Sequence, residues 1–136
     1  MLLNDFYKIL CKSIPEEIVS PSGVVSWQQD FNISLNPAHR IYEGHFEGNP
    51  VVPGVCQIQI ISELSSLAAG APLRLVTADN VKFPVSIIPG NSSQIEVRIN
   101  LRTDSEGCFV VNATLTGLDK VFIRFKGLFR KESLCQ

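Results

Sequence analysis

The stretch that decides the fold is VCQIQIISELSSLAA, residues 55–69, in which apolar side chains recur at helical spacing. A helix whose apolar surface covers more than half of its circumference is mostly buried, whereas a surface helix carries one narrower apolar stripe. On a helical wheel this segment has so wide a surface, built from Val55, Ile58, Ile60, Ile61, Leu64, Leu67, Ala68 and Ala69. The segment therefore predicts a central helix that other elements must cover.

On both sides of this helix apolar and polar residues alternate, which is typical of half-buried β-strands. Residues 24–35 and 93–103 each place a row of apolar side chains on one face, and Gln29 is the exception in the first row. The pattern continues through residues 108–116 and 120–131. The short turns DSEG and GLD join these later segments, which predicts an antiparallel meander.

The first residues of the chain carry a different spacing. In residues 2–12, LLNDFYKILCK, the apolar side chains of Leu2, Phe6, Ile9 and Leu10 fall at helical intervals. We therefore expect a short amphipathic helix that ends before Pro15. The whole chain then predicts an α+β fold in a single domain, residues 1–136, with a curved antiparallel sheet wrapped around one long central helix.

Composition excludes several classes of function. The chain is 45% hydrophobic and 18% charged, which suits a folded core, and its formal net charge of -1 gives no argument for nucleic acid or an anionic membrane. The cysteines at positions 11, 56, 108 and 135 form no CxxC pair or Cys/His cluster, so neither zinc nor a disulfide framework is expected. Scattered thiols favour a cytoplasmic location. We expect no membrane span and no bound metal or cofactor.

Chemistry-bearing residues gather where the central helix should begin. Pro53 and Gly54 mark that start, and the first N–H groups of a helix lack partners and carry partial positive charge. The N–H groups of Gly54 and Val55 could therefore hold an oxygen that becomes negative in a transition state. His45, nine residues before Gly54, can take and return a proton near neutral pH. The alternatives are an ordinary turn and a structural histidine, and for His39 we expect a structural role.

A polar stripe runs along the same helix. Gln59, Ser62, Glu63 and Ser66 follow at helical spacing, just after Cys56. Polar groups on a buried helix cost free energy unless they are paired. The stripe is either a solvated or backbone-bonded side of the helix, or the wall of a cavity beside His45, and the sequence leaves both open.

Residues 44–59, GHFEGNPVVPGVCQIQ, resemble the signature of the 3-hydroxyacyl-acyl-carrier-protein dehydratases of the hotdog superfamily. That signature runs G-H-F-P-G-x-P-x-x-P-G-V and then reaches an acidic residue on the central helix. Residues 80–92 resemble a second block of the family. The matching positions of the first block are Gly44, His45, Phe46, Gly48, Pro50, Pro53, Gly54 and Val55.

Two positions depart from the signature. Glu47 stands where the family has proline, and Gln59 stands where the family's catalytic acid falls, fourteen residues after His45. The family often has glutamine four residues further on, and this chain has Glu63 there. The acid and the amide are thus exchanged along the helix.

The resemblance implies a hotdog fold and a function. The implied reaction is the dehydration of a 3-hydroxyacyl thioester, carried on the phosphopantetheine arm of acyl carrier protein, to the trans-2-enoyl thioester. In it, His45 removes the proton next to the carbonyl, and the N–H groups of Gly54 and Val55 hold the carbonyl oxygen. Gln59, or Glu63 one turn along, assists the leaving hydroxyl, and in the family the partner subunit contributes the residue for this step.

Pathway and partners follow from the same resemblance. Residues 39–46, HRIYEGHF, are similar to enzymes of pigment and polyene clusters, which implies fatty-acid, aryl-polyene or pigment-type biosynthesis. The expected partners are acyl carrier protein and a second hotdog subunit, identical or related. Two alternatives stay open, namely a weakly active or non-catalytic partner subunit and an acyl thioesterase. Basic side chains on or beside the last predicted strand are either a docking surface for the carrier protein or a solvated edge: Arg124, Lys126, Arg130 and Lys131, with Lys82 elsewhere.

Overall fold

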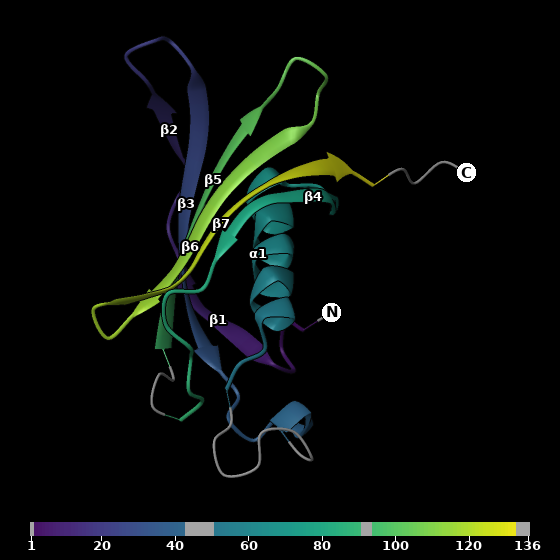
Figure 1. Cartoon of the computed structure of the whole chain (residues 1–136). Helices are drawn as coiled ribbons and strands as arrows, with labels where there is room; N and C mark the ends of the chain where they lie inside the picture. Colours follow the sequence, from purple (N-terminus) through teal and green to yellow (C-terminus); the bar gives the residue numbers. More distant parts are fainter. Residues whose placement is uncertain (1, 43–50, 91–93, 133–136) are drawn as a thin grey trace.

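The computed structural model describes residues 2–42, 51–90 and 94–132 (Figure 1). The strands in these residues form one seven-stranded antiparallel sheet in the order β1-β3-β5-β6-β7-β4, with β2 paired to β3. The elements are β1 (Tyr7–Lys12), β2 (Glu16–Val19), β3 (Val25–Leu35), the 3₁₀ helix η1 (Arg40–Tyr42), α1 (Gly54–Ala69), β4 (Leu73–Lys82), β5 (Gln94–Thr103), β6 (Phe109–Gly117) and β7 (Lys120–Lys131).

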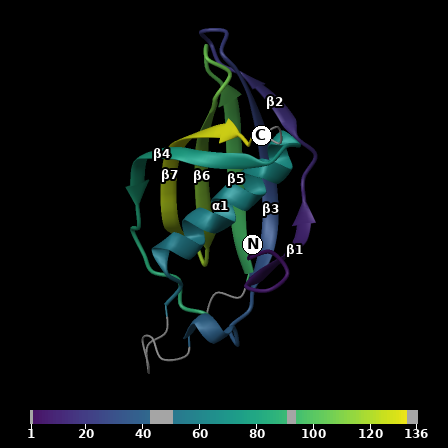
Figure 2. The ribbon, with the colours of Figure 1, turned by 90° about the vertical axis from the view of Figure 1, so that its right-hand side faces the viewer.

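The sheet curves around α1, so that one face of the sheet and the buried side of the helix share a core (Figures 1 and 2). On the helix, Ile60, Ile61 and Leu64 are fully buried. Alternate residues of β3 and β5, among them Ile33 and Val97, point into the same core. This arrangement confirms the predicted α+β fold of a curved antiparallel sheet around one helix.

The central helix has the predicted extent and a clear end. Gly70 follows it with φ 71°, and its N–H donates to the carbonyl oxygen of Leu67. Glycine adopts this left-handed conformation without the steric cost that a side chain brings. Gln29, the exception in the first predicted strand, is buried on the core face, where its side-chain amide donates to the carbonyl oxygen of Ser13 at 2.8 Å.

The predicted helix over residues 2–12 is wrong. Tyr7–Lys12 form strand β1, which pairs with β3 through Tyr7 opposite Leu35 and Ile9 opposite Ile33. An irregularity between Ile9 and Cys11 breaks the alternation that would have marked a strand in the sequence. Pairing with the otherwise open edge of β3 overrides the weak local preference for a helix.

The sequence did not mark β2 or β4 as strands. β4 pairs with β7, and its register shifts twice, between Leu75 and Thr77 and between Ala78 and Asn80. Each shift moves the following side chains out of strict alternation, which hides the strand from a pattern of period two. Within the described part of the chain, no helix is both long enough and apolar enough to cross a membrane.

Candidate active site

The start of α1 supplies two hydrogen-bond donors. Pro53 precedes the helix, and its carbonyl oxygen accepts the N–H groups of Cys56 and Gln57 at 3.0 and 3.2 Å. Among the described residues, no acceptor lies opposite the N–H groups of Gly54 and Val55. These two groups therefore have the free donors that were predicted for binding an oxyanion.

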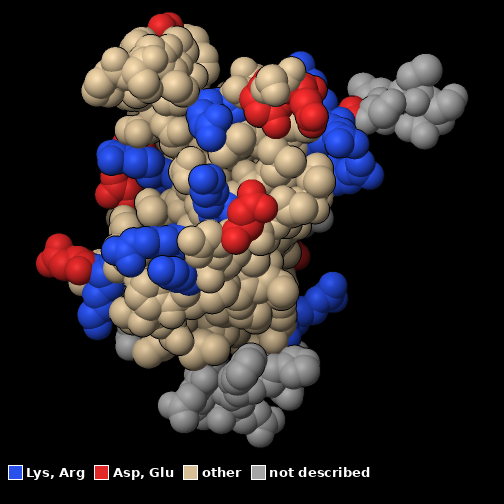
Figure 3. Space-filling model, turned by 45° about the horizontal axis from the view of Figure 1, so that its top comes forward, with Lys and Arg blue, Asp and Glu red and all other residues tan. Residues whose placement is uncertain are grey.

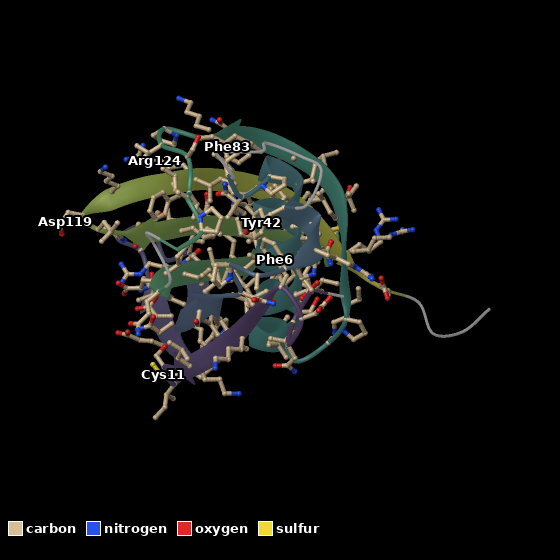
Figure 4. The ribbon with its side chains drawn as sticks, turned by 90° about the horizontal axis from the view of Figure 1, so that it is seen from below. Phe6, Cys11, Tyr42, Phe83, Asp119 and Arg124 are labelled. Carbon is tan, nitrogen blue, oxygen red and sulfur yellow. The ribbon has the colours of Figure 1, made fainter. Side chains whose placement is uncertain are left out.

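Phe83 lies directly against this helix start (Figure 4). A Cβ atom placed on Gly54 would be 2.8 Å from Cζ of the Phe83 ring, which is closer than real Cβ atoms approach other atoms. A side chain at this position would therefore have to displace the Phe83 ring. The ring is itself half-exposed and borders the two donors on one side.

Gln59 lies on the same uncovered face of the helix as Val55. Val55 is 75% exposed, and Gln59 is also exposed. Four residues along an α-helix advance by about 6 Å, so the two residues are neighbours one turn apart. The structure therefore brings together three of the predicted site residues, Gly54, Val55 and Gln59.

Glu63 continues this row but is covered and is only 7% exposed. One carboxylate oxygen, Oε2, accepts the N–H of Leu2 at 2.7 Å and Nε2 of Gln59 at 2.8 Å. The other, Oε1, accepts the N–H of Leu3 at 2.9 Å and the hydroxyl of Tyr7 at 3.0 Å. The carboxylate is thus held by four donors, three of which come from the N-terminal segment.

Tyr7 is a permanent donor in this cluster. Burial, followed by the nearby Glu63 carboxylate, raises the pKa of the phenol above its usual value. The hydroxyl consequently keeps its proton under all ordinary assay conditions and continues to donate to Glu63. Sequence reasoning missed this contact because it predicted the N-terminal segment as a separate helix.

The far end of the polar stripe is bonded to backbone. The Ser66 hydroxyl donates to the carbonyl oxygen of Ser62 at 3.1 Å and accepts the N–H of Leu73 at 3.0 Å. Ser66 thus fastens the first residue of β4 to the helix. Of the two interpretations left open by the sequence, the backbone-bonded one holds at this end, whereas Gln59 lies on the uncovered face and donates to Glu63.

His45 lies outside the described residues, so its predicted role stays a prediction. The 3₁₀ helix η1 precedes it by a few residues. There, Nδ1 of His39 accepts the N–H of Ile41 at 3.0 Å, and Nε2 lies 3.1 Å from a carboxylate oxygen of Asp5. The His39 ring also meets Phe6 edge to face, with centroids 5.2 Å apart. These contacts agree with the structural role expected for His39.

Tyr42, which sequence reasoning did not single out, ends η1 three residues before His45. Its ring packs against Phe6, with centroids 5.9 Å apart, and both residues are labelled in Figure 4. Its hydroxyl is buried without a hydrogen-bond partner in the described part of the chain. Burial, with a smaller contribution from Cys56, raises the pKa of Tyr42 to about 12. The only signal in the sequence was its place beside the glycine-histidine-phenylalanine motif.

The fold and the helix start together define an α+β protein of the hotdog class. The model of the ApeI-like family, described as ApeI dehydratase, matches residues 25–117. The chain belongs to this family, which confirms the resemblance to hotdog-fold 3-hydroxyacyl-acyl-carrier-protein dehydratases.

Curated relatives agree at low identity. The chain is 28% identical over 108 residues to the 3-hydroxyacyl-[acyl-carrier-protein] dehydratase FabZ of Oenococcus oeni, which covers 74% of each chain. It is 31% identical over 94 residues to the FabZ of Bartonella bacilliformis, which covers 63% of this chain and 60% of the relative. These relatives support a dehydratase-type enzyme.

Solved structures share the fold. An uncharacterized protein from Erwinia carotovora subsp. atroseptica superposes with a TM-score of 0.67 at 16% identity, over 93% of this chain and 95% of that one. The dehydratase heterocomplex ApeI:P from Xenorhabdus doucetiae gives 0.55 at 21% identity, over 87% and 100%. A putative thioesterase, yhdA from Lactococcus lactis, gives 0.63 at 8% identity, over 93% and 95%. The fold alone therefore does not distinguish a dehydratase from a thioesterase.

Proposed function

We propose that this protein dehydrates a 3-hydroxyacyl thioester, carried on the phosphopantetheine arm of acyl carrier protein, to the trans-2-enoyl thioester. The observation that carries the proposal is the uncovered helix start. There, the N–H groups of Gly54 and Val55 have no acceptor among the described residues, and Gln59 is exposed one turn beyond Val55, in a chain of the ApeI-like dehydratase family. The similarity of residues 39–46 to pigment and polyene enzymes favours an aryl-polyene or pigment-type pathway.

The proposed reaction breaks one C–H and one C–O bond and forms a carbon–carbon double bond. His45 takes the proton from C2, and the negative charge that develops on the thioester oxygen is held by the N–H groups of Gly54 and Val55. The 3-hydroxyl then leaves as water with the proton returned by His45. Gln59 can hydrogen-bond this hydroxyl, but an amide cannot deliver a proton at neutral pH.

The hydrogen bonds of Glu63 argue against this residue as the acid of the reaction. Its carboxylate accepts four hydrogen bonds and is covered by the N-terminal segment. To donate a proton to the substrate it would have to give up at least one of these bonds and leave a buried donor unpaired, which costs about 1–3 kcal/mol. His45 remains the group proposed for both proton transfers.

One assay separates this proposal from its two alternatives. The purified protein is incubated with a 3-hydroxyacyl carrier-protein thioester, and both the enoyl thioester and the free acid are followed by mass spectrometry. Formation of the enoyl product is expected. Release of free acid without enoyl product would identify a thioesterase, and no product at all would favour a partner subunit.

A second candidate function, that of a partner subunit, is favoured by Gln59. The resemblance implies that the acid of each site comes from the neighbouring subunit, and the ApeI:P structure is described as a heterocomplex. If this chain pairs with a related subunit that keeps the acid, the site containing His45 would receive that acid. Adding such a subunit to the assay should then raise turnover well above the sum of the two proteins measured alone.

We predict a dimer in which a second subunit pairs with the open edge of β4 and covers the adjoining face of α1. β4 ends the sheet, and apolar side chains are exposed on both elements and on the segment after β4: Val55, Leu67, Val76, Phe83, Val85 and Ile88. An open strand edge beside apolar side chains readily pairs with another chain. Light scattering at micromolar concentration should give twice the mass of the chain, and a monomer would contradict the prediction.

We predict that acyl carrier protein, which is acidic, docks on the basic side chains of β4 and β7. Arg74 lies directly opposite Arg130, and Lys82 lies opposite Arg124, so like charges face each other across the strand pair. Such pairs are unfavourable in isolation and favour an anionic partner. Figure 3 shows several of the molecule's Lys and Arg side chains, in blue, exposed on one face.

The measurement is carrier-protein affinity at low and high salt. Raising the salt from about 0.05 to 0.5 M should weaken binding about tenfold, because salt shortens the Debye length and so screens the attraction between exposed charges. Arg124→Glu should weaken binding at low salt by a similar factor. Lys12→Glu on β1, at the other end of the sheet, is the matched control and should change it less than about twofold. An affinity that does not depend on salt would contradict electrostatic docking of the carrier protein.

A further inference from the structure

The contact between Gln59 and Glu63 fixes which end of the Gln59 amide faces outward. An ionised carboxylate can only accept hydrogen bonds, and Oε2 of Glu63 lies 2.8 Å from the Gln59 amide. The NH₂ end of Gln59 must therefore face Glu63. The assignment of an amide's oxygen and nitrogen is usually open, but here the chemistry of the neighbour decides it.

Glu63 is itself held firmly in place. The N–H groups of Leu2 and Leu3 and the hydroxyl of Tyr7 all donate to it from outside the helix, and Tyr7 is only 1% exposed. Charge-assisted hydrogen bonds of this kind are stronger than neutral ones. The carboxylate consequently cannot rotate freely, and it tethers the end of an otherwise exposed side chain.

We infer that Glu63 is a positioning residue, which turns the carbonyl oxygen of Gln59 toward the uncovered face of α1 to accept the hydrogen of the substrate's 3-hydroxyl. This inference rests on the proposed function, because it takes a 3-hydroxyacyl group as the ligand. A hydroxyl that donates its own hydrogen to Gln59 keeps its oxygen lone pairs free. Those lone pairs are the place where a proton must arrive when the C–O bond breaks.

The test measures binding with two probes that cannot react. Both are acyl-pantetheine amides in which fluorine replaces both hydrogens at C2, so that no proton can be removed, and only one of them carries the 3-hydroxyl. The wild type should bind the hydroxyl probe about fivefold more tightly, the size of one net hydrogen bond. Glu63→Gln should abolish this preference, because a second amide at position 63 no longer dictates the orientation of Gln59.

Two further variants separate positioning from folding. Gln59→Met, which lacks the acceptor, should lose the preference as well, and combining it with Glu63→Gln should cause no additional loss. Tyr7→Phe removes one of the bonds that anchor the N-terminal segment to Glu63 but leaves the contact with Gln59. It should lower the melting temperature and keep the preference for the hydroxyl probe.

Three results would overturn the inference: a preference that survives in Gln59→Met, one that survives in Glu63→Gln, or one lost equally in Tyr7→Phe. A further readout needs no Glu63 variant. In isotope-labelled wild type, the hydroxyl probe, and not the other probe, should change the NMR chemical shift of the side-chain carbonyl carbon of Gln59. The absence of that difference would also overturn the inference. Failure of the proposed function looks different. The wild type would then form no enoyl product from the carrier thioester, whatever its preference between the probes.

Discussion

Replacing His45 by alanine is expected to lower turnover of a 3-hydroxyacyl thioester at least about 100-fold, because the reaction loses the group that takes and returns the proton. In the sequence, the histidine belongs to the GHF motif, which follows η1 and precedes α1. No other group proposed for the site can act as a base near neutral pH, since Gln59 is an amide and Glu63 is already fully bonded.

The chain offers a matched control, because it contains only two histidines. His39→Ala removes contacts to Asp5, Ile41 and Phe6, so it should lower the melting temperature but change turnover less than about threefold. The measurement is initial rate of enoyl formation, with circular dichroism and melting curves for each variant. A folded His45→Ala protein that keeps more than about a tenth of wild-type turnover would exclude the acid–base role.

The sequence predicted those parts of the fold in which one face is buried along a whole element. β5, β6, β7 and the second half of β3 each place one row of side chains in the core, and α1 buries one broad side, so the periods of two and 3.6 are visible in the residues. The N-terminal segment carries no such period. Phe6 and Tyr7 are adjacent and both buried, which neither a regular strand nor a surface helix would predict.

The sequence predicted the residues of the candidate site that belong to the motif and its helix, but not their distant partners. Gly54 and Val55 could be placed at the start of the central helix, and Gln59 one turn beyond Val55, because they belong to one helix, whose geometry is fixed. The partners of Glu63 could not be predicted, because two of them are backbone N–H groups that lie 60 and 61 residues away in the chain. Backbone groups are the same in every residue, so only the fold reveals where they donate.

Restoring the family's acid by Gln59→Glu is expected to raise turnover at least about tenfold, provided that protonation of the leaving hydroxyl limits the rate. General acid catalysis typically accelerates a reaction by more than about tenfold, so the expected gain in turnover is only part of that contribution. The new carboxyl group would stand on the uncovered face of α1, one turn from Val55, where the hydroxyl of the substrate is proposed to lie.

The neighbour of the new group should keep it protonated. In the wild type, the side chains at positions 59 and 63 are 2.8 Å apart, so Gln59→Glu would set two carboxyl groups side by side. Two carboxylates that close cannot both ionise easily, and the pKa of one of them rises. Three other donors already occupy the oxygens of Glu63, whereas the new group would stand on the exposed face, so the shared proton should reside on the new group, ready for donation.

The dependence on pH and on Glu63 tests this mechanism. A general acid works only below its own pKa, so the gain from Gln59→Glu should shrink as the pH rises above neutrality. It should also shrink in the double variant with Glu63→Gln, because the charge that keeps the new carboxyl group protonated is then gone. If Glu63 were the acid of the wild type, Glu63→Gln alone would instead cut turnover sharply, and Gln59→Glu would partly restore it. Should none of the three variants change turnover by more than about twofold, the proton transfers would rest on His45 alone, with the helix start holding the oxyanion.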